Sequence, residues 1–185
     1  MVLAGGASKR MGRDKRTMRA ASGLTFPEQA AATLRRAGAE QVLVSCAGHS
    51  PSSPRPFLPD LWPKSGPLAG MATALWKLDR FDAVAFLPCD MPLLTPEWPR
   101  RMLGLFESAR LRPLLTLQPE GRLQPLVSVV GRGHRESLAS AVERGHLAAG
   151  RLLLDLDAVA VRGLPPRRCL NVNTPGGRKC RRLRA

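Results

Sequence analysis

The chain has 185 residues, of which 44% are hydrophobic and 23% are charged, as in an ordinary globular domain. No apolar run approaches the ~20 residues that a membrane span requires, so we expect no membrane association. The formal net charge of +15 attracts phosphates, but neither an aromatic stacking platform nor a known nucleic-acid motif accompanies it. We therefore favour a small, highly phosphorylated substrate over nucleic acid.

The four cysteines are widely spaced, and no Cys-x-x-Cys or Cys/His cluster predicts a zinc site. Residues 1–4 are typical of a core strand rather than a signal peptide. We therefore expect a cytoplasmic protein whose thiols are incidental, and we expect it to be a monomer.

Two glycines, Gly5 and Gly6, follow the first predicted strand directly. Glycines let a backbone pass close to a ligand and leave N–H groups that can surround a phosphate. Four cations come next, at Lys9, Arg10, Arg13 and Lys15. The spacing fits neither a P-loop nor a dinucleotide-binding Gly-x-Gly-x-x-Gly turn, so the pattern predicts a nucleotide loop of another kind.

Apolar runs alternate with segments of helical periodicity along the chain. Strands are predicted at 1–4, 41–46, 57–60, 83–87, 113–117, 123–130, 158–161 and 169–172, and helices at 26–37, 66–78, 95–109, 134–144 and 151–156. This alternation predicts an α/β protein with a mostly parallel sheet. One domain is expected over residues 1–177, followed by a basic tail at 178–185.

Two carboxylates follow predicted strands, Asp60 after Leu58 and Asp90 after Leu87. In an open α/β sheet, ligands bind outside the carboxyl ends of the strands. A carboxylate in this place suits magnesium, which prefers oxygen ligands and keeps several waters. Asp90 is therefore the predicted metal ligand, and Asp60 is predicted to contact the base or the metal shell.

Several motifs together resemble the molybdenum cofactor guanylyltransferases, a branch of the nucleotidyltransferases with a Rossmann-like fold. They are Leu-Ala-Gly-Gly at 3–6, Arg-Met-Gly at 10–12, Asp-Lys at 14–15, Gly-Pro-Leu-Ala-Gly at 66–70, Gln-Pro-Leu at 124–126, Pro-Cys-Asp-Met-Pro at 88–92 and Asn-Val-Asn-Thr-Pro at 171–175. The resemblance covers nearly the whole chain and implies a three-layer Rossmann-like fold.

The resemblance also implies an activity, the transfer of GMP from Mg-GTP to the terminal phosphate of molybdenum-bound molybdopterin. It places the catalytic groups at Arg10, Lys15 and Asp90, with Mg²⁺ on Asp90. The implied GTP-binding residues are Leu3, Ala4, Gly5, Gly6, Lys15, Ser45, Asp60, Gly66, Pro67, Leu68 and Asp90, and the implied pterin-binding residues are Gly70, Asn171 and Asn173. Transient contact with proteins that deliver the cofactor or mature molybdoenzymes is implied as well.

The sequence departs from the family pattern at the end of the second strand, where Ser45 replaces a common asparagine and has a shorter reach. Basic residues after Pro175 also replace an acidic helix start. Two enzymatic alternatives remain open: a related cytidylyltransferase, and a nucleotidyltransferase that acts on a sugar or alditol phosphate. From another class, a basic nucleic-acid-binding module that reuses the fold also remains open.

Overall fold

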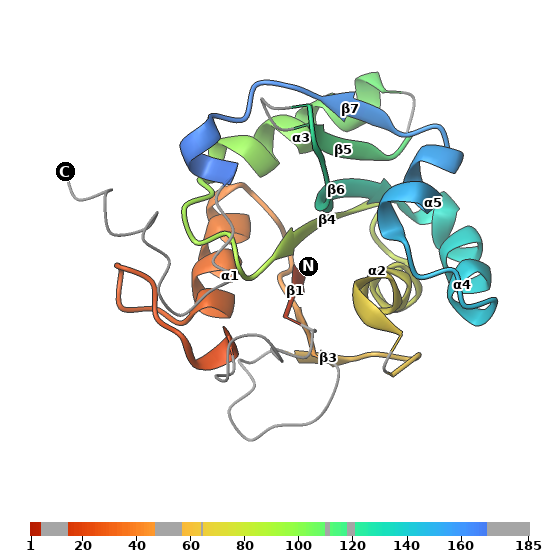
Figure 1. The fold of residues 1–185 in the computed structure, drawn as a ribbon, viewed down its shortest axis with the longest axis horizontal. Helices are drawn as coiled ribbons and strands as arrows, with labels where there is room; N and C mark the ends of the chain where they lie inside the picture. The colour runs from red at the N-terminus through yellow and green to blue at the C-terminus, as the bar shows by residue number, and fades with distance from the viewer. Residues whose placement is uncertain (5–14, 47–56, 64, 110–111, 118–120, 170–185) are drawn as a thin grey trace.

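The computed structural model describes residues 1–4, 15–46, 57–63, 65–109, 112–117 and 121–169 (Figure 1). The strands are β1 (Val2–Leu3), β2 (Val44–Cys46), β3 (Phe57–Pro59), β4 (Ala83–Pro88), β5 (Leu114–Leu117), β6 (Leu123–Gly131) and β7 (Val159–Val161). The α-helices are α1 (Phe26–Arg36), α2 (Gly66–Lys77), α3 (Glu97–Ser108), α4 (Arg135–Glu143) and α5 (Ala149–Asp155). Short 3₁₀ helices are η1 (Lys15–Thr17), η2 (Arg132–His134) and η3 (Pro166–Cys169).

The seven strands form one sheet in the order β3-β2-β1-β4-β6-β5-β7. Neighbouring strands are parallel from β3 to β4, and β5 is parallel to β7. β6 lies between β4 and β5 and is antiparallel to both. The predicted mostly parallel sheet is therefore confirmed, with one described strand reversed inside it.

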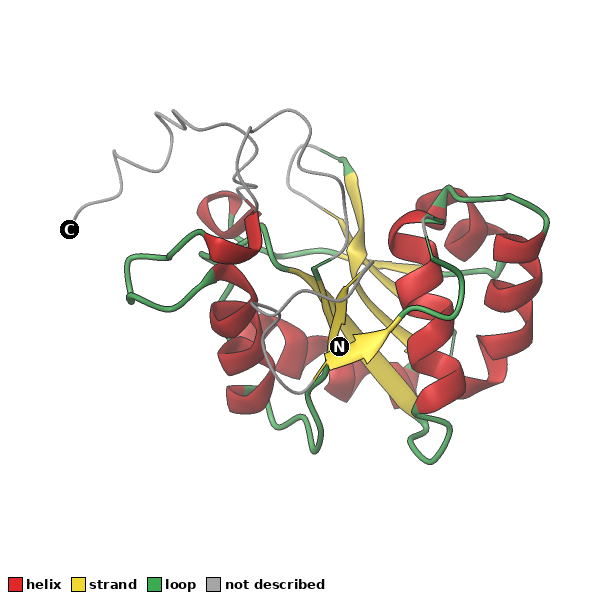
Figure 2. Cartoon of the chain, turned by 90° about the horizontal axis from the view of Figure 1, so that it is seen from below, coloured by secondary structure: helices red, strands yellow, loops and turns green. Residues whose placement is uncertain are grey.

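Helices cover both faces of the sheet, which gives three layers (Figure 2). One face packs against α1 and α3 through a buried apolar cluster that includes Phe26, Leu34, Trp98, Met102 and Phe106. The other face packs against α2, α4 and α5 through a second cluster that includes Leu68, Met71, Leu138 and Leu153. The α/β class and the three-layer architecture predicted from the sequence are both confirmed.

Several predicted boundaries and one predicted element were wrong. The second strand begins at Val44 rather than residue 41, and the last predicted helix begins at Ala149 rather than Arg151. Cys169 was expected in a strand but ends the 3₁₀ helix η3. Proline suits the first turn of a helix, and the N–H of Arg168 closes this turn on the carbonyl of Pro165 at 2.8 Å. Residues 170–172 of that predicted strand, and the predicted tail at 178–185, lie outside the described residues.

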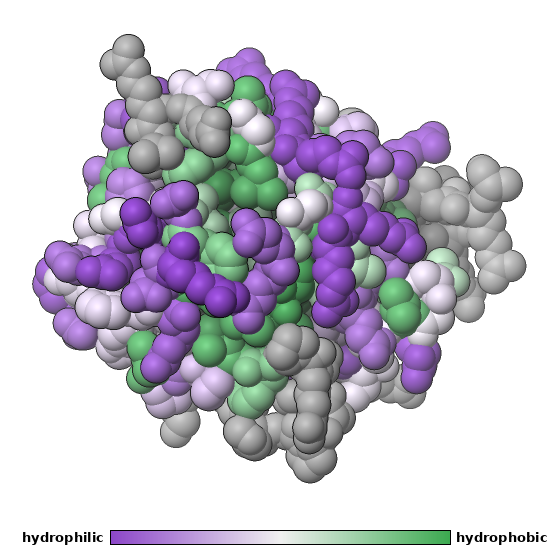
Figure 3. Space-filling view, turned by 180° about the vertical axis from the view of Figure 1, so that it is seen from behind, coloured by the Kyte–Doolittle hydropathy of each residue, from purple (hydrophilic) through white to green (hydrophobic). Residues whose placement is uncertain are grey.

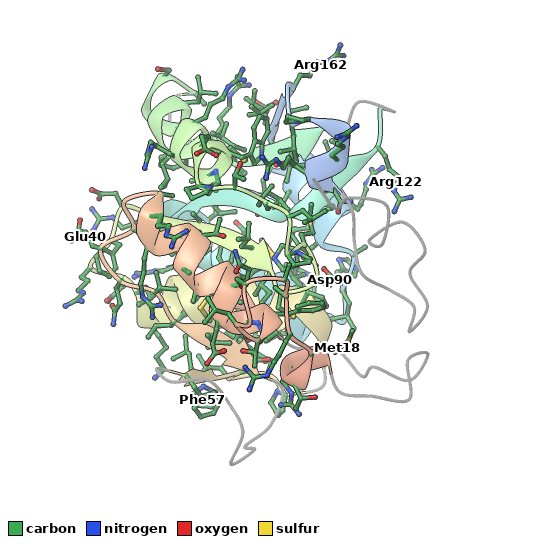
Figure 4. All side chains as sticks on the ribbon, turned by 90° about the vertical axis from the view of Figure 1, so that its left-hand side faces the viewer. Met18, Glu40, Phe57, Asp90, Arg122 and Arg162 are labelled. Carbon is green, nitrogen blue, oxygen red and sulfur yellow. The ribbon has the colours of Figure 1, made fainter. Side chains whose placement is uncertain are left out.

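A cavity of about 160 Å³ lies at the end of the sheet where β4 begins. Met1, Glu40, Phe81 and Ala85 are among its lining residues, and the Met1 amino group donates a hydrogen bond to the Ala85 carbonyl at 2.7 Å. Glu40 lies at the left edge of the molecule in Figure 4, well apart from Asp90. The cavity is therefore far from the end where β4 delivers Asp90.

The surface facing away from the viewer of Figure 1 is covered largely by hydrophilic side chains, with hydrophobic residues visible between them (Figure 3). Within the described part of the chain, no helix combines the length and the apolar character needed to span a membrane.

Candidate nucleotide site

The carboxyl ends of four parallel strands are level with one another. Leu3 pairs with Ser45 on one side and with Pro88 on the other, and Ser45 pairs in turn with Leu58. Backbone hydrogen bonds extend this row, from Ala4 N to Ser45 O at 3.0 Å and from Cys89 N to Leu3 O at 3.2 Å. The polar residues that follow these strands therefore emerge along one edge of the sheet.

The two predicted carboxylates sit equally far beyond this row. Asp60 comes two residues after Leu58, and Asp90 comes two residues after Pro88. Because β2 and β1 lie between β3 and β4, three strand spacings of about 4.8 Å separate the two positions by roughly 14 Å. Both carboxylates therefore lie along the same edge of the sheet, with two strands between them.

Asp90 is projected from a well-anchored turn after β4. It is partly buried, whereas its neighbours Cys89 and Met91 are 7% and 3% exposed. The turn is closed by a hydrogen bond from Leu94 N to Met91 O at 3.1 Å. The Thr33 hydroxyl of α1 shares its proton between the carbonyl of Gln29 at 3.0 Å and that of Leu94 at 3.3 Å. The buried neighbours on both sides anchor the backbone at Asp90.

A single oxygen ligand on a rigid turn fits Mg²⁺, which is commonly held by one or two carboxylates together with waters and substrate phosphates. The described residues contain no group of three or more His, Cys, Asp or Glu side chains that could form a closed metal cage. The donor set at this edge is thus suited to a metal that arrives with its nucleotide.

Asp60 is held by contacts from two neighbouring elements. The Ser45 hydroxyl on β2 donates a hydrogen bond to Asp60 Oδ1. The backbone N–H of Leu61 donates to Thr73 Oγ1 on α2 at 2.9 Å, which fixes the chain just after Asp60. Partial burial raises the pKa of the Asp60 carboxyl, whereas the Ser45 hydrogen bond lowers it.

Helix α2 approaches β2 closely at Gly70. A Cβ atom on residue 70 would lie 2.6 Å from Ser45 Oγ and 3.2 Å from Leu3 Cδ2. Real Cβ atoms do not come this near to a hydroxyl oxygen, so the contact requires glycine. Gly70 was predicted on the pterin side, and the structure shows it buried against two residues predicted to bind GTP.

The start of α2 explains two other residues of the Gly-Pro-Leu-Ala-Gly motif. Gly66 has a φ of +71°, a conformation that residues with a Cβ rarely adopt, and Pro67 occupies the first turn, where proline is favoured. Leu68 is fully buried, as are nearly all of Leu3 and Ala4, so these side chains pack in the core. Any nucleotide contact from these three residues must come from the backbone.

Several predicted site residues cannot be placed. Gly5, Gly6, Arg10, Asn171 and Asn173 lie outside the described residues. Lys15 opens the 3₁₀ helix η1, and the structure describes only its backbone. Their roles remain predictions.

Two residues that the sequence did not single out support the site. Thr73 is fully buried in α2 and accepts the hydrogen bond that anchors the chain after Asp60; its signal was a polar residue inside an apolar helix. Arg168 in η3 donates to the Leu93 carbonyl at 3.1 Å, next to the Asp90 turn. No sequence signal distinguished Arg168 from the other arginines.

Residues 1–159 match the family described as MobA-like NTP transferase domain. The chain belongs to this family. The match covers every described strand and helix up to the start of β7, including both carboxylates of the site. The resemblance inferred from the sequence motifs is thereby confirmed.

The chain is 40% identical over 95 residues to a molybdenum cofactor guanylyltransferase from Xanthomonas euvesicatoria pv. vesicatoria, a match that covers 51% of this chain and 48% of that protein. The chain spans about half the length of the curated relatives it matches.

Two solved structures share the fold. The molybdopterin-guanine dinucleotide biosynthesis protein A from Archaeoglobus fulgidus has a TM-score of 0.77 at 22% identity, with 98% of this chain and 94% of that chain covered. Rv0371C from Mycobacterium tuberculosis, solved in complex with manganese, has a TM-score of 0.56 at 17% identity, with 92% and 90% covered.

Proposed function

We propose that this chain is a molybdenum cofactor guanylyltransferase, which transfers GMP from Mg-GTP to the terminal phosphate of molybdenum-bound molybdopterin and releases pyrophosphate. The observation that carries the proposal is the pair of carboxylates on one edge of the sheet, Asp60 beyond β3 and Asp90 beyond β4. Their separation of roughly 14 Å suits an extended nucleotide, with the base at one carboxylate and the phosphates at the other. The relatives named guanylyltransferase supply the choice of base and acceptor.

In this reaction an oxygen of the acceptor phosphate attacks the α-phosphorus of GTP. The new P–O bond forms as the bond to the bridging oxygen of the β-phosphate breaks, and pyrophosphate leaves. The attacking phosphate monoester has a second pKa of about 6 and is largely ionised near neutral pH, so no general base is required. What the protein must supply is alignment of two anions and compensation of their charge.

We assign each residue a role according to its position along the edge of the sheet. Asp90 would hold the metal ion; the manganese complex of the Mycobacterium tuberculosis neighbour supports a divalent ion in this fold. When bound, Mg²⁺ supplies positive charge next to the transferring phosphoryl group. Lys15 and Arg10 would add cationic charge beside the phosphates, and the backbone N–H groups of Gly5 and Gly6 would surround them. Asp60 would accept hydrogen bonds from the guanine edge.

The pterin side is assigned to the segment after η3. Asn171 and Asn173 would contact the pterin, and Arg168, which precedes them in the chain, donates a hydrogen bond to the Leu93 carbonyl next to the Asp90 turn. Proteins that deliver the cofactor or receive it would meet the enzyme at this side.

Calorimetry with GTP, CTP and ATP, with and without Mg²⁺, tests the proposal. Selective, magnesium-dependent GTP binding is expected for the wild type, and Asp90→Asn should weaken it at least tenfold and remove most GMP transfer. Asp82→Asn is a matched control, because Asp82 is an exposed carboxylate that immediately precedes β4 at its other end. Lys15→Ala should also remove most turnover while the fold is kept.

A preference for CTP would assign the chain to the cytidylyltransferases. Binding of GTP with transfer to a sugar phosphate, and none to molybdopterin, would correct the acceptor. No nucleotide binding combined with salt-sensitive binding to random DNA would replace the enzyme by a basic nucleic-acid-binding module.

A further inference from the structure

We propose that Ser45 is a positioning residue, whose hydroxyl orients the Asp60 carboxylate toward the guanine base, and that Gly70 provides the space this hydroxyl occupies. The inference rests on the proposed function, because it refines the GTP site. It assigns Ser45 an indirect role, acting through Asp60 rather than touching the nucleotide.

Burial is the first reason to place Ser45 behind the site. Ser45 is 2% exposed and lies within β2, between β1 and β3. Its hydroxyl donates to Asp60 Oδ1, and Gly70 closes on it from α2. A hydroxyl has one proton to donate, and here it is committed to the carboxylate. The side chain therefore has neither the exposure nor a spare proton for a ligand.

The geometry at Asp60 is the second reason. A carboxylate offers about four lone-pair directions on two oxygens, and Ser45 uses one of those on Oδ1. The anchor from Leu61 N to Thr73 Oγ1 holds the backbone beside it. With the backbone and one oxygen fixed, Oδ2 and the rest of Oδ1 point in a defined direction. Guanine presents two adjacent donors, N1–H and the 2-amino group, which such a carboxylate can accept together.

The close approach of α2 explains why the pair needs Gly70. A methyl group at position 70 would lie 2.6 Å from Ser45 Oγ, so the hydroxyl would have to rotate away from Asp60. Gly104 in α3 is a helical glycine with no atom within 4 Å of its would-be Cβ. Gly104→Ala is therefore a matched control for Gly70→Ala.

Ser128 provides the matched control for Ser45. It lies in β6 of the same sheet, is also 2% exposed, and its hydroxyl has no hydrogen-bond partner among the described residues. Ser45→Ala removes a buried hydroxyl that is hydrogen-bonded to a carboxylate. Ser128→Ala removes a buried hydroxyl that has no hydrogen-bond partner among the described residues. Any general effect of losing a buried serine should appear in both.

The decisive measurement is the ratio of kcat/KM for GTP to that for ITP, which lacks the 2-amino group. Because both substrates are compared in the same sample, the ratio does not depend on the folded fraction. We expect Ser45→Ala and Gly70→Ala each to lower this ratio, on the order of tenfold, because a mobile carboxylate no longer accepts both donors. Ser128→Ala and Gly104→Ala should leave it unchanged.

The double variant Ser45→Ala/Gly70→Ala should resemble Ser45→Ala alone, since the hydroxyl that the methyl group displaces is already gone. Additive losses would overturn the role of Gly70. A ratio of GTP to dGTP that changes in Ser45→Ala, with the ITP ratio unchanged, would overturn the positioning role and assign Ser45 to the ribose. An unchanged ratio for both pairs would overturn the role of Ser45 altogether.

A measurement without nucleotide separates failure of this inference from failure of the proposed function. The Asp60 pKa, followed by carboxyl NMR, should rise in Ser45→Ala because the hydrogen bond that lowers it is lost. An unchanged pKa would overturn the inference, whatever the enzyme does. If the wild type bound no GTP, the proposed function would fail and the base-directed role would fail with it.

Discussion

Buried polar side chains differ in this protein by whether they have a partner. The Trp98 indole N–H donates to Thr116 Oγ1 at 2.8 Å, and the Thr116 hydroxyl lies 3.3 Å from Met102 Sδ. Thr116 is fully buried and Trp98 is 5% exposed. A buried donor that loses its acceptor retains the full cost of desolvation, whereas removal of both partners can be nearly neutral.

This contrast gives a stability prediction. Thr116→Val keeps the side-chain volume but leaves the Trp98 N–H without an acceptor, so the free energy of unfolding should fall by about 1–3 kcal/mol. Urea denaturation measures the change. The double variant Thr116→Val/Trp98→Phe should show non-additivity, because the second change removes the orphaned donor. Strict additivity would mean that the bond contributes nothing.

Ser128 gives the opposite prediction. Its hydroxyl is buried without a described partner, so Ser128→Ala removes a desolvated group and should raise the free energy of unfolding by about 1 kcal/mol. The same urea titration measures it. A loss of stability greater than about 1 kcal/mol would indicate that the hydroxyl has a partner after all.

At the scale of elements, helix α1 has clear local signals at both its start and its end. Thr25 accepts a hydrogen bond from the Glu28 N–H, and the Glu28 carboxylate accepts one from the Thr25 N–H at 2.7 Å, which is a capping box. Gly38, with a φ of +98°, follows the last turn. α1 in turn supplies Thr33, which holds the loop after Asp90.

Loss of the capping box at the start of α1 should lower the stability of the protein. Thr25→Ala should lower the free energy of unfolding by about 1 kcal/mol, whereas Glu28→Gln preserves the capping box and should lower it by less. The hydrogen bonds from Thr25 lower the pKa of Glu28, so their stabilisation is present above the ordinary value of 4.5 and is lost as the pH falls below it. Equal effects of Thr25→Ala on either side of this range would contradict the assignment.

At the scale of the whole molecule, the Met1 amino group is buried beside β4 and donates a hydrogen bond to Ala85 O at 2.7 Å. Burial lowers the pKa of the Met1 amino group to about 5 from an ordinary value of 8.0. The folded state therefore keeps a neutral amine where the unfolded state binds a proton. The free energy of unfolding should be highest above pH 8 and should fall by up to ~4 kcal/mol as the pH drops from 8 to 5.

Chemical denaturation of the 185-residue chain at several pH values tests this. An Nα-acetylated chain carries no titratable amine at Met1. Its free energy of unfolding should vary less between pH 8 and pH 5, because the two chains differ only at this amine. Identical profiles would show that the amine is charged in the folded protein.

Local pattern in the sequence was sufficient to predict the α/β class and to place Asp60 and Asp90 just beyond the ends of two strands. Ala83–Pro88 is a continuous apolar run, as a strand buried on both faces must be, so Asp90 was identifiable as a residue delivered by a strand end. Asp60 followed by the same reasoning. The motifs around these positions carried the resemblance to the guanylyltransferases. Gly66 and Pro67 contributed to it because glycine and proline have conformational preferences that can be recognised from the sequence alone.

The tertiary structure alone decided which strands are neighbours and which side chains meet. The apolar pattern of Leu123–Gly131 predicts a strand, but nothing local places it beside β4 in the reversed direction. In the same way, Ser45, Asp60 and Gly70 were each candidates, but only the folded chain shows the hydroxyl between the carboxylate and the glycine. Strand pairing and side-chain contact depend on packing between residues far apart in sequence, whereas a local pattern records only whether a segment is buried and with what period.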